Sequence, residues 1–140
     1  MDEPEIRGSC LCGGVRWAHV GKAFLFNHCH CVQCRKSHGA AFASNLHVRP
    51  AQFRWLAGES QVARFESSPG VRRSFCSVCG GNVAVVLPDQ VVIPAATLDD
   101  PLDDKPVVHF FAGEKVAWLE LADGLPAFPT WPPRPQGETR

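Results

Sequence analysis

Seven cysteines in three tightly spaced groups constrain this chain more than any other feature of its sequence. An odd number of cysteines cannot all pair as disulfides within one chain, and the reducing compartment expected for a chain with no apolar leader disfavours disulfides. The spacings are typical of metal ligands, so we expect zinc bound by thiolates. The groups are C-x-C at Cys10 and Cys12, C-x-C-x-x-C at Cys29, Cys31 and Cys34, and C-x-x-C at Cys76 and Cys79.

The size and charge of the chain limit the class of protein to which it can belong. It has 140 residues, of which 45% are hydrophobic, and this suits one folded domain. The formal net charge is zero, so nothing draws the whole chain toward nucleic acid or an acidic membrane surface. No apolar run is long enough to span a bilayer. The sequence therefore favours a cytoplasmic protein without nucleic-acid or membrane partners.

Short β-rich runs separated by turn signals make up most of the sequence. We expect an all-β fold of mainly antiparallel strands, forming one domain over residues 1–128, with a proline-rich tail over residues 129–140. Only short helices or turns are expected, one directly after Cys31 and one over residues 101–104. The expected strands lie at residues 15–17, 24–26, 41–48, 53–55, 62–65, 71–75, 82–87 and 91–96.

The first and last cysteine pairs together supply four thiolates, which complete a tetrahedral shell for zinc. Residues two apart on a strand point to the same side, so Cys10 and Cys12 can face one ion if their segment is extended. Cys76 and Cys79 are followed at once by two glycines, which let the backbone turn tightly around an ion. We predict a closed, structural zinc site, and the alternative is a set of free buried cysteines.

The remaining three cysteines, here called the triplet (Cys29, Cys31 and Cys34), leave one position of a zinc shell without a thiolate. Three protein ligands and one open position are typical of a catalytic zinc. A histidine could instead close the shell, and His28 and His38 are the nearest candidates. The first interpretation predicts an exchangeable fourth ligand, and the second predicts another structural site.

An open site with three thiolates favours a thiol over an activated water as the fourth ligand. Three thiolates give the zinc unit a net negative charge, which weakens it as a Lewis acid toward water. Soft, sulfur-rich zinc accepts a further thiolate and lowers the pKa of the thiol that it binds. The chemistry indicated is addition of a small-molecule thiol to a small electrophile, or the reverse reaction.

Four residues near the triplet are candidates for binding a substrate. Arg35 and Lys36 could hold a carboxylate of a thiol substrate, although a solvated turn is the simpler interpretation of either residue alone. His38 lies four residues after the last cysteine of the triplet, at a usable ligand spacing. Asn45 is unfavourable in a strand and could face the second zinc, or could bond to the backbone.

For the other histidines and for the tryptophans we expect structural positions and no part in the site. We expect His19 and His47 at the surface, His109 as a core or hydrogen-bonded histidine, and Trp17, Trp55 and Trp118 in the core. Trp131, in the proline-rich tail, is expected to dock either on the domain or on a second subunit of a homodimer.

Four stretches of the sequence resemble the glutathione-dependent formaldehyde-activating enzyme family, which also includes centromere protein V. They are GSCLCGGVRW, CHCVQCRKSHGAAF, SPGVRRSFCSVCGG and TLDDP, and the resemblance runs from about Gly8 to Phe128. It implies an all-β, Mss4-like zinc fold with two zinc ions. The implied ligands are Cys10, Cys12, Cys76 and Cys79 for a structural zinc, and Cys29, Cys31 and Cys34 for the second zinc.

The resemblance also implies an activity, which is carbon–sulfur lyase chemistry with glutathione as co-substrate. In the founding enzyme, glutathione condenses with formaldehyde into S-hydroxymethylglutathione. Family membership does not fix the electrophile. We weigh against this enzyme a zinc-stabilised, protein-binding module without catalysis, and thirdly a zinc store or thiol redox sensor. We favour the thiol-dependent enzyme.

Overall fold

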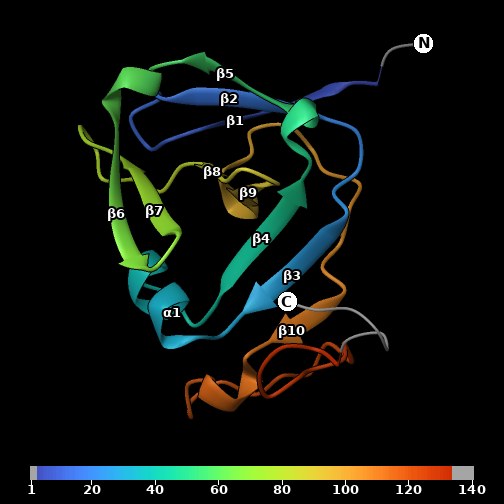
Figure 1. Ribbon diagram of the computed structural model, residues 1–140. Coiled ribbons are helices and arrows are strands. Elements are labelled where there is room, and N and C mark those ends of the chain that lie inside the picture. Colours follow the sequence, from blue (N-terminus) through green and yellow to red (C-terminus); the bar gives the residue numbers. More distant parts are fainter. Residues whose placement is uncertain (1–2, 134–140) are drawn as a thin grey trace.

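The computed structural model describes residues 3–133 and arranges their strands in three sheets (Figure 1). One sheet has the order β1-β2-β5, from β1 (Glu5–Ser9), β2 (Arg16–Val20) and β5 (Phe53–Ala57). A second, of five strands, has the order β10-β3-β4-β9-β8, from β10 (Val108–Phe110), β3 (Leu25–Cys29), β4 (Ala43–Val48), β9 (Val91–Pro94) and β8 (Val85–Val86). The third is a hairpin of β6 (Val62–Ser68) and β7 (Val71–Cys76).

The mainly antiparallel β class is confirmed. Among the paired strands of residues 3–133, only β10 and β3 run parallel. The expected strands all have a counterpart in the structure, although the run at residues 82–87 contributes only the two residues of β8. The first strand, β1, was not predicted.

One α-helix, α1 (Val32–His38), occurs in the described part of the chain, as predicted after Cys31. It begins at Cys31, whose sulfur accepts a hydrogen bond from the backbone N–H of Cys34 at 3.3 Å, and it ends at Gly39 with φ of 59°. The helix expected over residues 101–104 is wrong: this stretch has no regular structure, and the Asp104 carboxylate instead accepts a bond from the N–H of Ala23. Short 3₁₀ turns are η1 (Pro50–Gln52), η2 (Glu59–Gln61), η3 (Ala95–Thr97) and η4 (Ala112–Glu114).

None of these helices, within residues 3–133, is long and apolar enough to cross a membrane.

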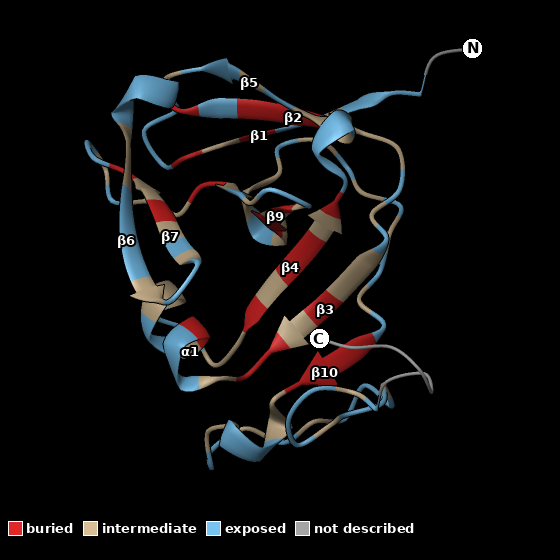
Figure 2. Ribbon diagram, viewed as in Figure 1, coloured by how far each residue is buried: buried red, intermediate tan, exposed pale blue. Residues whose placement is uncertain are grey.

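The hydrophobic core lies between the three-stranded and five-stranded sheets, where Figure 2 shows buried positions along β2 and β4. Trp17, Leu46 and Ile93 are fully buried, and Trp55 packs edge-on against Trp17 with ring centroids 6.2 Å apart. The core position expected for Trp118 is wrong, because this side chain is 76% exposed.

The surface position expected for two histidines is also wrong. His19 is fully buried on β2, the central strand of its sheet. His47 is partly buried on β4, and its two ring nitrogens bond to Asn27 at 2.9 Å and to Gln90 at 2.8 Å. Both residues lie on inner strands, where neighbours cover them.

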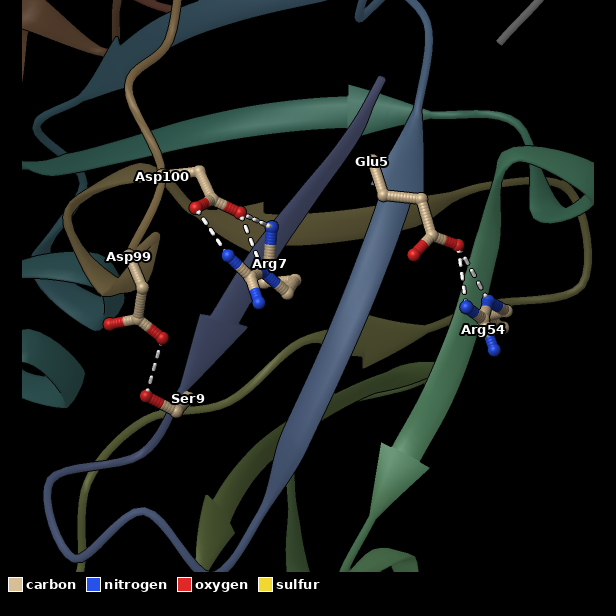
Figure 3. A network of polar contacts seen from close by, with 6 residues as sticks. All are labelled: Glu5, Arg7, Ser9, Arg54, Asp99 and Asp100. Atoms are coloured by element: carbon tan, nitrogen blue, oxygen red, sulfur yellow. Dashed lines mark hydrogen bonds and ion pairs between the residues drawn. The ribbon is translucent and has the colours of Figure 1, made fainter. Parts of the chain in front are cut away.

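Polar contacts hold β1 in place on the outside of its sheet (Figure 3). Arg7 binds Asp100 through two side-chain nitrogens at 2.9 and 3.0 Å, and the Ser9 hydroxyl donates to Asp99 at 2.7 Å. The hydrogen bonds from Arg7 lower the pKa of Asp100 to about 2. Exposed ion pairs contribute little to stability, so these contacts serve mainly to fix the register of the strand.

Candidate functional site

The four-thiol cluster (Cys10, Cys12, Cys76 and Cys79) is assembled by residues from distant parts of the chain. Its sulfurs all lie within 4.8 Å of one another. The Sγ atoms of Cys10 and Cys12 are 3.6 Å apart, and those of Cys12 and Cys76 are 3.9 Å apart. Tetrahedral zinc with Zn–S bonds of about 2.3 Å separates its sulfurs by about 3.8 Å. These two distances therefore fit a tetrahedral zinc ion.

Two tight turns present these thiols. Cys10 and Cys12 lie in the turn between β1 and β2, closed by a bond from the Gly13 N–H to the Cys10 carbonyl at 3.0 Å. The two thiols therefore come together through a turn and not through an extended segment. At the other pair, the Gly80 N–H donates to the Cys76 carbonyl at 2.8 Å. Gly80 has φ of 76°, which a glycine adopts without strain.

The triplet forms at the junction of β3 and α1. Cys29 ends β3, Cys31 precedes the helix, and Cys34 lies in its first turn. The three sulfurs lie within 4.8 Å of one another, and Cys29 and Cys34 are buried. Hydrogen bonds from the thiols of Cys29 and Cys34 lower the pKa of Cys31 well below its ordinary range, and the contact with Cys31 raises the pKa of Cys29.

No histidine in residues 3–133 comes within ligand distance of all three sulfurs of the triplet. His28 precedes Cys29 on the same strand and so points to the opposite face, where its Nδ1 bonds to the Ser44 hydroxyl at 2.8 Å. His38 lies at the end of α1 and borders a small cavity of about 40 Å³ together with Asn45. The geometry therefore gives no support to a shell closed by either histidine.

A cleft of about 840 Å³ opens beside the triplet. All three cysteines border it, and Asn45 and His47 reach it from β4. An aromatic wall completes it, formed by Phe24, Phe110, Phe111 and Trp131.

Trp131 docks on the domain, which is one of its two predicted positions. Its ring lies 4.9 Å from that of Phe111 and 5.8 Å from that of Phe110, both measured between centroids. This contact places residues close to the end of the described chain at the edge of the cleft.

Arg73 is the cation of this cleft, and the sequence reasoning missed it. Its Nη1 lies 3.6 Å from the Cys34 sulfur, its Nη2 lies 3.4 Å from Oε1 of Gln33, and its Nε donates to the Ser67 hydroxyl at 3.1 Å. It reaches the triplet from β7. The stretch SPGVRRSF contains it, but nothing in the sequence spacing distinguishes Arg73 from Arg72, which is exposed.

The structure does not bring all the predicted substrate residues to the cleft. Asn45 borders it, and Arg35, Lys36 and His38 do not. Arg35 and Lys36 lie on another side of α1, where they border a cavity of about 310 Å³ with Trp118. Lys36 also borders a neighbouring cavity of about 630 Å³ that includes Arg73. A direct role for Arg35 in this cleft is therefore not supported by the geometry.

Comparisons with a family model and with a related protein both point to the same family. The family model described as glutathione-dependent formaldehyde-activating enzyme matches residues 5–114. A Halomonas elongata protein, named as a candidate glutathione-dependent formaldehyde-activating enzyme, is 33% identical in an alignment 128 positions long that covers 83% of this chain and 80% of that protein. A crystal structure of a Rhodobacter sphaeroides protein matches with a TM-score of 0.51 and 21% identity, over 69% of this chain and 91% of that one, and shows a likeness of fold alone.

Proposed function

The chain belongs to the glutathione-dependent formaldehyde-activating enzyme family, and from that premise we propose that it is a zinc-dependent enzyme of the carbon–sulfur lyase type. It binds a thiol, with glutathione the one that the family indicates, and adds it to a small electrophile such as formaldehyde, or releases it. The observation that carries this proposal is the triplet, three thiols that no described histidine completes, at the side of an open cleft.

The two cysteine clusters have different roles in this proposal. The four-thiol cluster holds a structural zinc, supported by the sulfur spacing. The triplet holds the second zinc, which when bound lowers the pKa of a substrate thiol and presents it as thiolate. The reaction forms one C–S bond between the thiolate sulfur and the carbonyl carbon, while the C=O π bond opens. The thiol gives up its proton to water when the thiolate forms, the oxygen takes a proton from water after the addition, and no atom changes its oxidation state overall.

The other side chains of the cleft bind and orient the substrates. The Arg73 guanidinium, beside the triplet, holds a carboxylate of the thiol substrate, which is the role that we had expected of Arg35 and Lys36. The Asn45 side-chain amide can donate a hydrogen bond to the oxygen of the electrophile. The aromatic wall limits the water around the thiolate, which keeps the nucleophile poorly solvated.

Absorption spectra of cobalt-substituted protein, recorded before and after addition of glutathione, test the proposal. Thiolate-to-cobalt charge transfer reports the number of sulfurs bound, so glutathione should increase it. Cys31→Ser should abolish this increase and the formation of S-hydroxymethylglutathione, followed by NMR. His38→Ala is the matched control, because it also alters α1 but removes no ligand.

Two outcomes would contradict this assignment. If His38→Ala changed the cobalt spectrum before glutathione was added, His38 would be the fourth ligand and the site would be closed. If small thiols changed nothing in protein with both sites filled, thiol activation would be wrong. The alternative, a protein-binding module, would then be pursued from the exposed Trp118 and the cavity that it borders.

A further inference from the structure

Three side chains of metal-ligand type meet on the other face of the five-stranded sheet, away from the cleft. They are His28 on β3, His109 on β10 and Asp123 in the segment that follows, and one ligand atom from each lies within 4.8 Å of the others. The parallel register sets His109 directly beside His28, and Phe110 beside Cys29. Since Phe110 and Cys29 border the cleft, alternation turns the two histidines to the opposite face.

Hydrogen bonds fix the ring orientation of both histidines. Nδ1 of His28 bonds to the Ser44 hydroxyl at 2.8 Å, and Nδ1 of His109 bonds to Nε2 of the buried His30 at 2.8 Å. Each ring therefore has its Nε2 on the side away from these bonds, and in His109 that atom already bonds to Asp123. Metal-binding histidines ordinarily engage their second nitrogen in this way, which sets the tautomer and the ring plane.

The carboxylate lies at ligand distance and is accessible. Oδ2 of Asp123 is 2.8 Å from Nε2 of His109, whereas two ligands of one ion at about 2.1 Å lie about 3 to 3.4 Å apart. For this pair of ligand atoms, a shift of a few tenths of an ångström would make room for an ion in place of the hydrogen bond, and the His28 ligand atom lies within 4.8 Å of both. Oδ1 of Asp123 accepts the N–H of Leu125 at 3.0 Å, and the side chain is 43% exposed, so an ion can enter from solvent.

We propose that His28, His109 and Asp123 form a third metal site, separate from both cysteine clusters, for a divalent transition-metal ion. Two imidazoles and one carboxylate suit Zn²⁺, Co²⁺, Ni²⁺ or Fe²⁺ better than the hard ions Mg²⁺ and Ca²⁺. Bound there, the ion would join β3 and β10 to the segment around Asp123. That segment already contacts the sheet, through the bond from the His109 N–H to the Pro126 carbonyl at 2.8 Å.

The test is titration of Co²⁺ into full-length protein whose two cysteine clusters are already filled with zinc. Calorimetry should show one further equivalent bound, and its absorption should lack thiolate charge transfer, because its donors are nitrogen and oxygen. Asp123→Asn, which keeps the shape of the side chain and removes its charge, should weaken this binding at least tenfold. Asp103→Asn, an exposed aspartate on another segment, should bind as the wild type does.

NMR provides a second readout that does not depend on a variant. Bound Co²⁺ should broaden the ring signals of His28 and His109 before that of His38. The proposal is overturned if no further equivalent binds, if Asp123→Asn binds Co²⁺ as tightly as the wild type, or if the broadening centres on another histidine. None of these results bears on thiol activation at the triplet, so failure here and failure there are distinguishable.

Discussion

At the residue scale, Arg73 brings a permanent positive charge to within 3.6 Å of the Cys34 sulfur. We predict that Arg73→Ala lowers kcat/KM for glutathione roughly 10- to 100-fold, mainly through KM, because a charge-assisted hydrogen bond to a carboxylate contributes about 1.5–3 kcal/mol. Arg73→Lys should lose less, since it keeps the charge but not the two-pronged geometry. The assay is formation of S-hydroxymethylglutathione.

Arg72→Ala is the control for this prediction, because Arg72 is exposed on the same strand and alternation turns it the other way. Equal losses in the Arg72 and Arg73 variants would show that Arg73 does not contact the thiol substrate.

Two glycines offer a test of backbone fit. Gly58 and Gly70 have φ of 75° and 78°, but a Cβ on Gly58 would lie 2.0 Å from the Gly14 carbonyl oxygen, and one on Gly70 would meet nothing within 4 Å. We predict that Gly70→Ala costs about 1 kcal/mol of unfolding free energy, for the left-handed backbone alone. Gly58→Ala should cost more than about 3 kcal/mol, because backbone must move. Urea unfolding of zinc-loaded protein measures both, and similar losses would contradict the prediction.

The role of an individual residue could be predicted only where its partners lie close to it in the sequence. Cys29, Cys31 and Cys34 are neighbours in sequence, so their meeting was visible before the fold was known. Arg73 was not, because 39 positions separate it from Cys34 and only the pairing of sheets and helix brings the two together. His19 was misplaced for a related reason: β2 is a central strand, so its consecutive residues 17–19 are all buried and show no alternation.

At the scale of elements, residues 129–133 contribute Trp131 to the aromatic wall of the cleft. We predict that Trp131→Ala lowers the unfolding free energy by about 1–2 kcal/mol, because a half-buried aromatic ring loses its packing on Phe110 and Phe111. Activity with glutathione should fall as well. Trp118→Ala, at a side chain that is 76% exposed, should change stability by less than about 0.5 kcal/mol. Chemical denaturation measures the unfolding free energies of the two variants. Equal values would show that Trp131 does not stabilise the packing of residues 129–133 on the domain.

Elements with local signals were the predictable ones. Turn residues and β-branched runs indicated most strands, and α1 was expected directly after Cys31. The strand β1 was missed because EIRGS is short and charged, and what stabilises it is distant: Arg7 with Asp100 and Ser9 with Asp99. The parallel pairing of β10 with β3 joins residues about 80 positions apart, and no local pattern encodes it.

At the scale of the whole molecule, the two cysteine clusters should differ in their effect on stability. Cys12 and Cys76 are 64 positions apart, so a metal in the four-thiol cluster closes a long loop between two sheets, whereas the triplet lies within one short stretch. We predict that Cys79→Ser lowers the thermal unfolding midpoint far more than Cys31→Ser does, at the same zinc concentration. A chelator should abolish the difference by emptying both sites. Equal midpoints for the two variants would contradict a structural role for the first cluster.

The position of β10 has a consequence for how this protein is made. Until residues 108–110 have been synthesised, β3 has no partner on one side and presents free backbone N–H and C=O groups along that edge. A translation product that stops before Val108 would keep both sets of metal-binding thiols, yet its unpaired strand would be a template for association with other chains. Premature termination would therefore yield an aggregating fragment, and C-terminal deletion is a poor route to a smaller version of this protein.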